Sequence, residues 1–192
     1  MPEVRTVTPF ERDRAVDTVV LAFAADPVAR WCWPDSRQYL TSMPRFIFAL
    51  GGCAFSRNSA FCTDDLSGAA LWLPPGVHPD EAALGEIVEA TVPRSVRDDL
   101  LTLLEAMAGH HPEEPHWYLP FIGVDPARQG QGYGDALMIR ALAQCDRDGR
   151  SAYLESSNPR NLTLYHRHGF ASVGRIQAGS SPTITPMVRQ PR

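Results

Sequence analysis

The fold of this chain is decided by the stretch Trp117-Tyr118-Leu119-Pro120-Phe121-Ile122-Gly123-Val124-Asp125-Pro126-Ala127-Arg128-Gln129-Gly130-Gln131-Gly132-Tyr133-Gly134. Its first eight residues form an apolar run of strand length, which Asp125-Pro126 ends. After the glycine-rich turn, apolar residues recur at helical spacing as far as Cys145. The stretch therefore predicts a strand, a turn and a helix, with free backbone N–H groups where the helix begins.

Three glycines within five residues indicate a turn that binds phosphate. Gly130, Gly132 and Gly134 remove side chains where a pyrophosphate would approach the backbone, and the helix dipole favours an anion there. A nucleotide-binding P-loop is excluded because no Gly-Lys-Ser/Thr follows. The dinucleotide fingerprint fails because Asp135 occupies its third glycine position. The spacing favours another coenzyme with a pyrophosphate, and the alternative is a tight turn without a ligand.

Outward from this stretch, the pattern predicts further helices and strands. Helices are expected from Thr8 to about Asp26, at 37–50, at 80–108 with a break at Pro93, and at 159–168. Strands are expected at 60–63, 69–73, 152–156, 171–177 and 183–188. The order predicts an α/β domain with a mixed sheet. Since 192 residues suffice for one core, a single domain over residues 1–192 is expected.

Two segments resemble the GNAT superfamily of N-acetyltransferases. Gln129-x-x-Gly132-x-Gly134 is similar to their Q/R-x-x-G-x-G/A motif, and Asn161-Leu162-Thr163-Leu164-Tyr165-His166-Arg167-His168-Gly169-Phe170 is similar to a later segment of theirs. The phrases His116-Trp117-Tyr118-Leu119 and Leu154-Glu155-Ser156-Ser157-Asn158-Pro159-Arg160-Asn161-Leu162 look closest to puromycin N-acetyltransferase-like members. The resemblance implies a GNAT fold. That fold is a twisted, mixed but mostly antiparallel sheet of about six or seven strands, with splayed central parallel strands and flanking helices.

The resemblance also implies that acetyl-coenzyme A is the co-substrate. Backbone amides of the turn would hold its pyrophosphate, the strand end would pair with its pantetheine arm, and Asn161 would lie near its thioester. The residues expected to bind it are Ile122, Gly123, Val124, Gln129, Gly130, Gln131, Gly132, Tyr133, Gly134, Asp135 and Asn161.

Acyl transfer from a thioester to an amine needs a neutral amine, a stabilised oxyanion and a proton for the departing thiolate. The resemblance implies that Tyr165 is the general acid and that a backbone N–H near Ile122 stabilises the oxyanion. Glu155 would bind a cationic acceptor or act as the base. His116 is an alternative base because imidazole titrates near neutral pH.

The acceptor is expected to be a primary amine of a small molecule, such as an antibiotic or an aminonucleoside-like metabolite. Trp31 and Trp33 lie in a proline-bounded segment and could form aromatic walls for it. Two alternatives remain open: acetylation of a protein N-terminus or lysine, and a non-catalytic sensor domain that binds acyl-CoA.

Composition limits other partners. The formal net charge of −4 argues against nucleic acid. The four cysteines form no closely spaced pair, so no metal site is expected. The chain shows neither a signal peptide nor an apolar run long enough to cross a membrane, which favours the cytoplasm. The sequence is compatible with a monomer or a homodimer.

Overall fold

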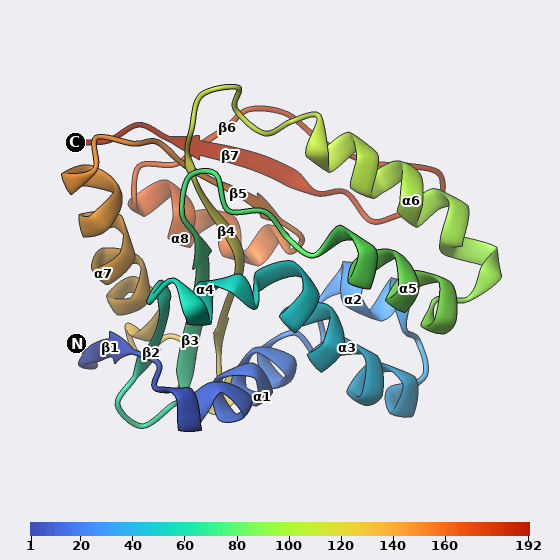
Figure 1. Ribbon diagram of the computed structural model, residues 1–192, viewed down its shortest axis with the longest axis horizontal. Coiled ribbons are helices and arrows are strands. Elements are labelled where there is room, and N and C mark those ends of the chain that lie inside the picture. The colour runs from blue at the N-terminus through green and yellow to red at the C-terminus, as the bar shows by residue number, and fades with distance from the viewer.

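A seven-stranded sheet runs through the computed structural model, which describes residues 1–192 (Figure 1). Its strands are β1 (Val4–Thr6), β2 (Ala60–Thr63), β3 (Gly68–Leu73), β4 (Trp117–Val124), β5 (Ala152–Ser156), β6 (Ala171–Ser172) and β7 (Thr185–Arg189). The order across the sheet is β1-β2-β3-β4-β5-β7-β6, and only β4 and β5 pair in parallel. The expected mixed, mostly antiparallel sheet is thus confirmed.

Eight α-helices flank the sheet. They are α1 (Arg12–Ala22), α2 (Pro27–Cys32), α3 (Ser36–Gly51), α4 (Cys53–Ser56), α5 (Glu81–Thr91), α6 (Arg94–Ala108), α7 (Tyr133–Arg147) and α8 (Leu162–Arg167). Short 3₁₀ turns precede α1, follow β4 and precede α8, at Pro9–Glu11, Pro126–Arg128 and Pro159–Asn161. No helix combines the length and the hydropathy that crossing a membrane requires.

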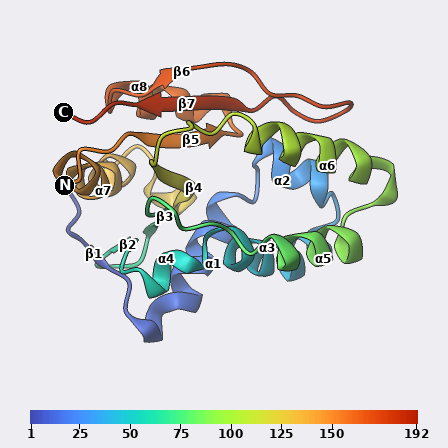
Figure 2. The same cartoon turned by 45° about the horizontal axis from the view of Figure 1, so that its top comes forward.

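The two faces of the sheet bury two different apolar clusters, because side chains alternate along each strand. Leu71 and Tyr153 point into the larger cluster, with α1, α2, α3, α5 and α6. Ala70 and Leu154 point into the smaller cluster, with α7 and Tyr165 of α8. Figure 2 shows α2, α3, α5 and α6 gathered on one side of the molecule, away from α7.

A β-bulge in β4 shifts that alternation and opens the sheet. Leu71 pairs with Phe121 and Leu73 with Tyr118, so two residues of β4, Leu119 and Pro120, oppose one residue of β3. Pairing between β4 and β5 ends at Leu119, directly before a proline that has no N–H to donate. The remaining part of β4 pairs only with β3, and the expected splay of the central parallel strands is confirmed.

Three expectations about the elements were wrong in detail. The sequence did not predict β1, which has only three residues. Asp26 does not terminate the first helix, which ends at Ala22, but caps the N-terminus of the separate helix α2. The strand expected at 171–177 is only Ala171–Ser172, followed by a single bridge from Ile176 to Ile184. Short edge elements depend on tertiary pairing, which periodicity does not detect.

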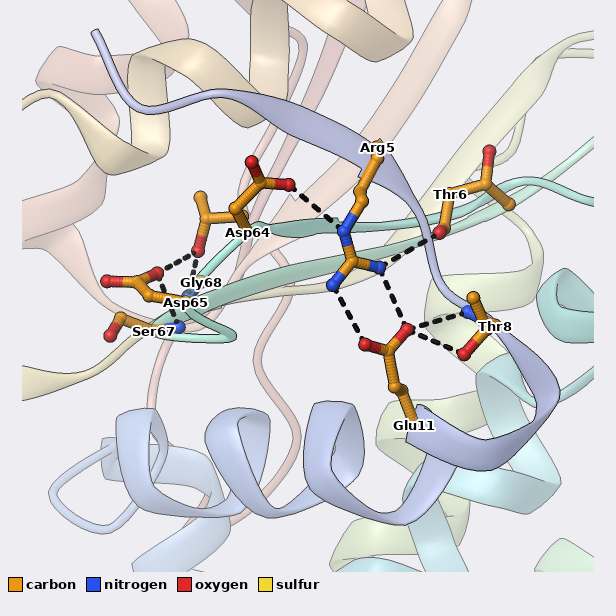
Figure 3. A network of polar contacts seen from close by, with 9 residues as sticks. Arg5, Thr6, Thr8, Glu11, Asp64, Asp65, Ser67 and Gly68 are labelled. Atoms are coloured by element: carbon orange, nitrogen blue, oxygen red, sulfur yellow. Dashed lines mark hydrogen bonds and ion pairs between the residues drawn. The ribbon is translucent and has the colours of Figure 1, made fainter.

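The strand β1 is fixed by a network around one arginine (Figure 3). The guanidinium of Arg5 donates two hydrogen bonds of 2.8 Å to Glu11, before α1, and one of 3.0 Å to Asp64 in the turn after β2. Glu11 also accepts from the backbone N–H of Thr8 at 3.1 Å, which forms a capping box. The hydrogen bond from Arg5, assisted by Thr8, lowers the pKa of Glu11 to about 2.

Candidate active site

The glycine-rich turn leads from β4 into α7 and presents unpaired donors. None of the backbone N–H groups from Gln129 to Gly132 donates a hydrogen bond to another backbone group, and those of the first turn of α7 have no partner within the helix. Gly130 and Gly132 have φ angles of 74° and 83°, and a Cβ atom at either position would have nothing within 4 Å. Free donors that face open space are the arrangement that binds an anion.

A larger cavity of about 620 Å³ lies against this turn. It is lined by all but one of the residues expected to hold the coenzyme: Ile122, Gly123, Val124, Gln129, Gly130, Gly132, Tyr133, Gly134, Asp135 and Asn161. Gln131 is the exception, and its Nε2 donates to the carbonyl of Ala127 at 3.1 Å. Gly123 also permits close packing, because a Cβ there would lie 2.8 Å from the Cβ of Ala22 on α1.

The charge of Asp135, next to the turn, is compensated. Its carboxylate accepts hydrogen bonds from Arg167 at 3.1 Å and contacts Nε2 of His168 at 2.9 Å. Burial opposes ionisation of this carboxyl, but the contacts with Arg167 and His168 outweigh burial and lower its pKa. Arg128 and Arg160 line the same cavity. The basic residues leave the cavity suited to a polyanionic ligand.

Tyr165 lies where the larger cavity meets a second, smaller cavity. It is 5% exposed, and its ring packs edge-on against Phe170 with the centroids 6.2 Å apart. Burial, and then the charge of Asp26, raises the pKa of this phenol. A phenol with a raised pKa keeps its proton at neutral pH and is able to donate it.

The smaller cavity has a volume of about 110 Å³, and 19 of its 25 lining residues are hydrophobic. Helices α2, α3 and α6 contribute Cys32, Met43 and Leu104 among others. Trp33 lines it, with its indole N–H donated to Oγ1 of Thr91 at 3.0 Å. Trp31 lines neither cavity, and its indole donates to Oγ of Ser180 at 3.3 Å. The lining of the smaller cavity offers few polar atoms, and the cavity therefore suits an apolar group of a ligand.

Two buried carboxylates border the smaller cavity and differ in their hydrogen bonding. Asp26 is 6% exposed, and it accepts from the backbone of Val28 and Ala29 and from Ser157, at 3.0, 3.1 and 2.5 Å. Burial raises its pKa. The side chain of Glu155 is 2% exposed, and its Oε1 makes no hydrogen bond, although Nε2 of His111 lies 3.4 Å away. Glu155 is thus the carboxylate with an oxygen free to receive a proton or a cationic donor.

The Acetyltransferase (GNAT) family model matches residues 95–170 of this chain. An uncharacterized N-acetyltransferase of Schizosaccharomyces pombe is 26% identical over 195 residues, which covers 93% of this chain and 79% of that protein. A solved structure from Corynebacterium glutamicum, described as histone acetyltransferase HPA2 and related acetyltransferase, is 26% identical. It superposes with a TM-score of 0.70, covering 100% of this chain and 97% of that chain. The chain is therefore similar to GNAT-family acetyltransferases in sequence over residues 95–170 and in its overall fold.

The fold is also shared by a more distant enzyme. The polyamine N-acetyltransferase of Drosophila melanogaster has a TM-score of 0.69 at 14% identity, with coverage of 99% of this chain and 100% of that chain. At that identity the likeness concerns the fold alone.

The predicted catalytic residues do not all lie in one place. Tyr165 and Glu155 line the smaller cavity together with Asn161. His116 lines neither cavity. Its Nδ1 lies 2.8 Å from the carbonyl oxygen of Glu114, and its Nε2 lies 3.0 Å from Nδ1 of His111. Burial is the main cause that lowers the pKa of His116.

Sequence reasoning missed two residues of this region. Asp26 was interpreted as the end of a helix, although Asp followed by Pro is also the usual signal for a helix start, with Asp as N-cap and Pro at the first position. His111 lies in the loop before β4, and its Nε2 is 3.4 Å from Oε1 of Glu155. No spacing rule connects His111 with Glu155, because the contact forms only when the loop folds over β5.

Proposed function

We propose that this protein transfers the acetyl group of acetyl-coenzyme A to the primary amine of a small molecule, with both substrates bound together. The observation that carries the proposal is the meeting of two cavities at Tyr165. The larger cavity is bordered by the anion-binding turn, and the smaller one is apolar and contains an unpaired carboxylate oxygen. A thioester at the junction would face a general acid on one side and an amine on the other.

The residues around the larger cavity fit acetyl-coenzyme A. The unpaired N–H groups of the turn and the side chains of Arg128 and Arg160 match its phosphates. The end of β4 pairs only with β3, so its other edge has backbone groups free for the amides of the pantetheine arm. Asn161 lines both cavities and lies where the thioester would be. The coenzyme would supply the activated acetyl group.

The residues of the chain divide the chemistry between them. Glu155 accepts a proton from the amine, which makes the nitrogen nucleophilic. A backbone N–H of β4 near Ile122 stabilises the charge that develops on the acyl oxygen. The hydroxyl of Tyr165 donates its proton to the departing sulfur. Asp26 accepts hydrogen bonds from Val28, Ala29 and Ser157 beside the junction, and burial raises its pKa.

The smaller cavity favours an amine with an apolar body. Its lining is mostly hydrophobic, and its one free carboxylate oxygen suits one ammonium group. An aminonucleoside of the puromycin type, as the sequence resemblance suggests, belongs to this class of acceptor. The Drosophila neighbour is described as a polyamine N-acetyltransferase, and a small amine acceptor for this protein agrees with that description. A protein lysine is the alternative acceptor, and a coenzyme-binding sensor is the alternative without catalysis.

Turnover of acetyl-coenzyme A with a panel of amines tests the proposal. The panel contains alkylamines, arylethylamines, diamines, puromycin and a lysine peptide. We expect turnover with an apolar small amine, and the Tyr165→Phe variant should lower kcat about 100-fold because the general acid is lost. Coenzyme binding without turnover of any amine would support the sensor. An undiminished rate in the Tyr165→Phe variant would contradict the role of Tyr165.

We also propose that residues 1–192 act as one domain, because helices of the N-terminal half and strands of the C-terminal half line the smaller cavity together. Both a monomer and a homodimer are compatible with this arrangement.

A further inference from the structure

Three side chains form a row that leads from the smaller cavity toward the loop before β4. Oε1 of Glu155 lies 3.4 Å from Nε2 of His111. Nδ1 of His111 lies 3.0 Å from Nε2 of His116. Nδ1 of His116 lies 2.8 Å from the backbone carbonyl oxygen of Glu114. The row therefore connects a buried carboxylate to two imidazoles that are each partly exposed.

The carbonyl at the end of the row fixes the direction of its hydrogen bonds. A carbonyl oxygen only accepts, so Nδ1 of His116 carries a proton. In neutral His116, Nε2 is then an acceptor, and Nδ1 of His111 must donate to it. In neutral His111, the remaining Nε2 has a lone pair that faces the carboxylate of Glu155. Nε2 of His111 and Oε1 of Glu155 are then both acceptors, so one further proton can be shared between these two atoms.

The surroundings keep this proton position inside the protein. The ring of His111 packs against those of Tyr118 and Tyr153, with centroids 4.6 and 4.4 Å away. The hydroxyl of Tyr153 is buried without a hydrogen-bond partner. The charge of Glu155 acts on both tyrosines and on His116, and His78 acts on His116 from outside the row. No group of three or more His, Cys, Asp or Glu side chains is arranged to hold a metal ion.

We propose that His111 and His116 form a proton relay that carries the proton of the acceptor amine from Glu155 toward the solvent. The inference rests on the proposed function, because it gives Glu155 the role of base. Glu155 takes one proton from the ammonium nitrogen and transfers it to Nε2 of His111. His111 then releases the proton on its Nδ1 to Nε2 of His116, and His116 loses its Nδ1 proton to water. One proton enters the row and one leaves it, and reorientation of the rings restores the first state.

The relay explains why a loop histidine lies against a buried glutamate. Glu155 alone would have to release its proton inside an apolar cavity with no hydrogen-bond partner for Oε1. With His111 next to it, each turnover ends with the carboxylate ionised again. His111 and His116 act through Glu155 and are positioning residues for the proton, not groups that contact the acetyl donor.

Steady-state kinetics with matched histidine variants tests the relay. His111→Gln and His116→Gln should each lower kcat by about 10- to 100-fold, with the KM for acetyl-coenzyme A unchanged, and they should alter the pH profile of kcat. His110→Gln is the control and should leave both unchanged, because Nδ1 of His110 contacts the carbonyl of Ala106 and the ring takes no part in the row. Added imidazole should restore part of the rate of His111→Ala. Unchanged rates and pH profiles in both relay variants would overturn the proposal.

An NMR measurement separates the relay from the proposed function. In ¹⁵N spectra of the imidazole rings, His116 should carry its proton on Nδ1 at high pH. At high pH, Nε2 of His111 should have the ¹⁵N resonance of a ring nitrogen without a proton, and Glu155→Gln should move that resonance, because an amide can donate a hydrogen bond to this nitrogen and a carboxylate cannot. If the wild-type protein turns over no amine but this change is seen, the proposed function fails and the shared proton position stands. An Nε2 resonance of His111 that Glu155→Gln leaves unmoved overturns the relay, whatever the activity.

Discussion

The two cavities that meet at Tyr165 are built in different ways. Eleven of the 23 residues that line the larger cavity come from one continuous segment, the end of β4, the turn and the start of α7, and the others come from 21–26 and 158–167. The smaller cavity is lined by residues from α2, α3, α6, β4 and β5, which are far apart in the sequence. The anion-binding turn of the first cavity depends on local chain geometry, and the second cavity depends on how separate elements pack.

This difference has a consequence for substitution. A backbone site changes little when the surrounding side chains vary, provided that its glycines remain. A site made of side chains changes with each residue that lines it. We therefore expect the donor to be the common property of proteins that share this turn, and the acceptor to be specific to this chain.

The largest effect is expected for Glu155→Gln, which should affect the function of the smaller cavity and not that of the larger one. Removing the base and the negative charge from the smaller cavity should lower kcat/KM for the best amine by about 100-fold or more, while the affinity for acetyl-coenzyme A stays the same. Steady-state kinetics and calorimetric binding measure these two quantities. Glu113→Gln, an exposed change in the loop before β4, is the control. A parallel loss of coenzyme affinity would show that the cavities are not independent.

A smaller effect is expected for Gly132→Ala, which should affect the larger cavity and not the smaller one. A Cβ at a φ of 83° costs about 1–2 kcal/mol, and it projects into the open space in front of the turn. We expect about 10-fold weaker binding of acetyl-coenzyme A, measured by calorimetry, with the relative preference among amines unchanged. Gly149→Ala introduces the same kind of strain at a φ of 59°, outside both cavities, and should not alter binding. Equal effects of the two variants would assign the loss to stability rather than to the turn.

The smallest effect is expected for Leu104→Ala, which enlarges the smaller cavity from the side of α6. Lost contacts should lower kcat/KM for the best amine by roughly 10-fold, and bulkier amines in the same panel should lose less. Leu101→Ala, at an exposed position on the same helix, is the matched control. If the order of preference among amines is the same in both variants, the acceptor does not occupy this cavity.

Much of the fold could be predicted from the sequence because the residue patterns that define its helices and strands are local. The strands at 60–63, 117–124 and 152–156 were predicted with their observed bounds. The helices at 37–50 and 80–108 differ from the prediction by one or two residues at their ends, and the predicted break at Pro93 is confirmed. Apolar periodicity and Gly or Pro at the ends define such elements within a short window. The strand β1 and the helix α2 were not predicted, since each is short and is held by contacts with distant residues, such as Arg5 with Asp64 and Asp26 with Ser157.

In the candidate site, too, some features are local to the chain and others depend on contacts between distant residues. The sequence by itself determined the turn from Gln129 to Gly134, the proline in β4 and the tyrosine at 165, because φ angles, missing N–H groups and a helical register are properties of the local chain. Only the tertiary structure decided that Pro120 lies at a bulge where β4 leaves β5, that Asp26 borders both cavities, and that Trp31 borders neither. Only the folded chain brings His111 to Glu155, because a contact between residues 44 positions apart depends on the path of the chain and not on its composition.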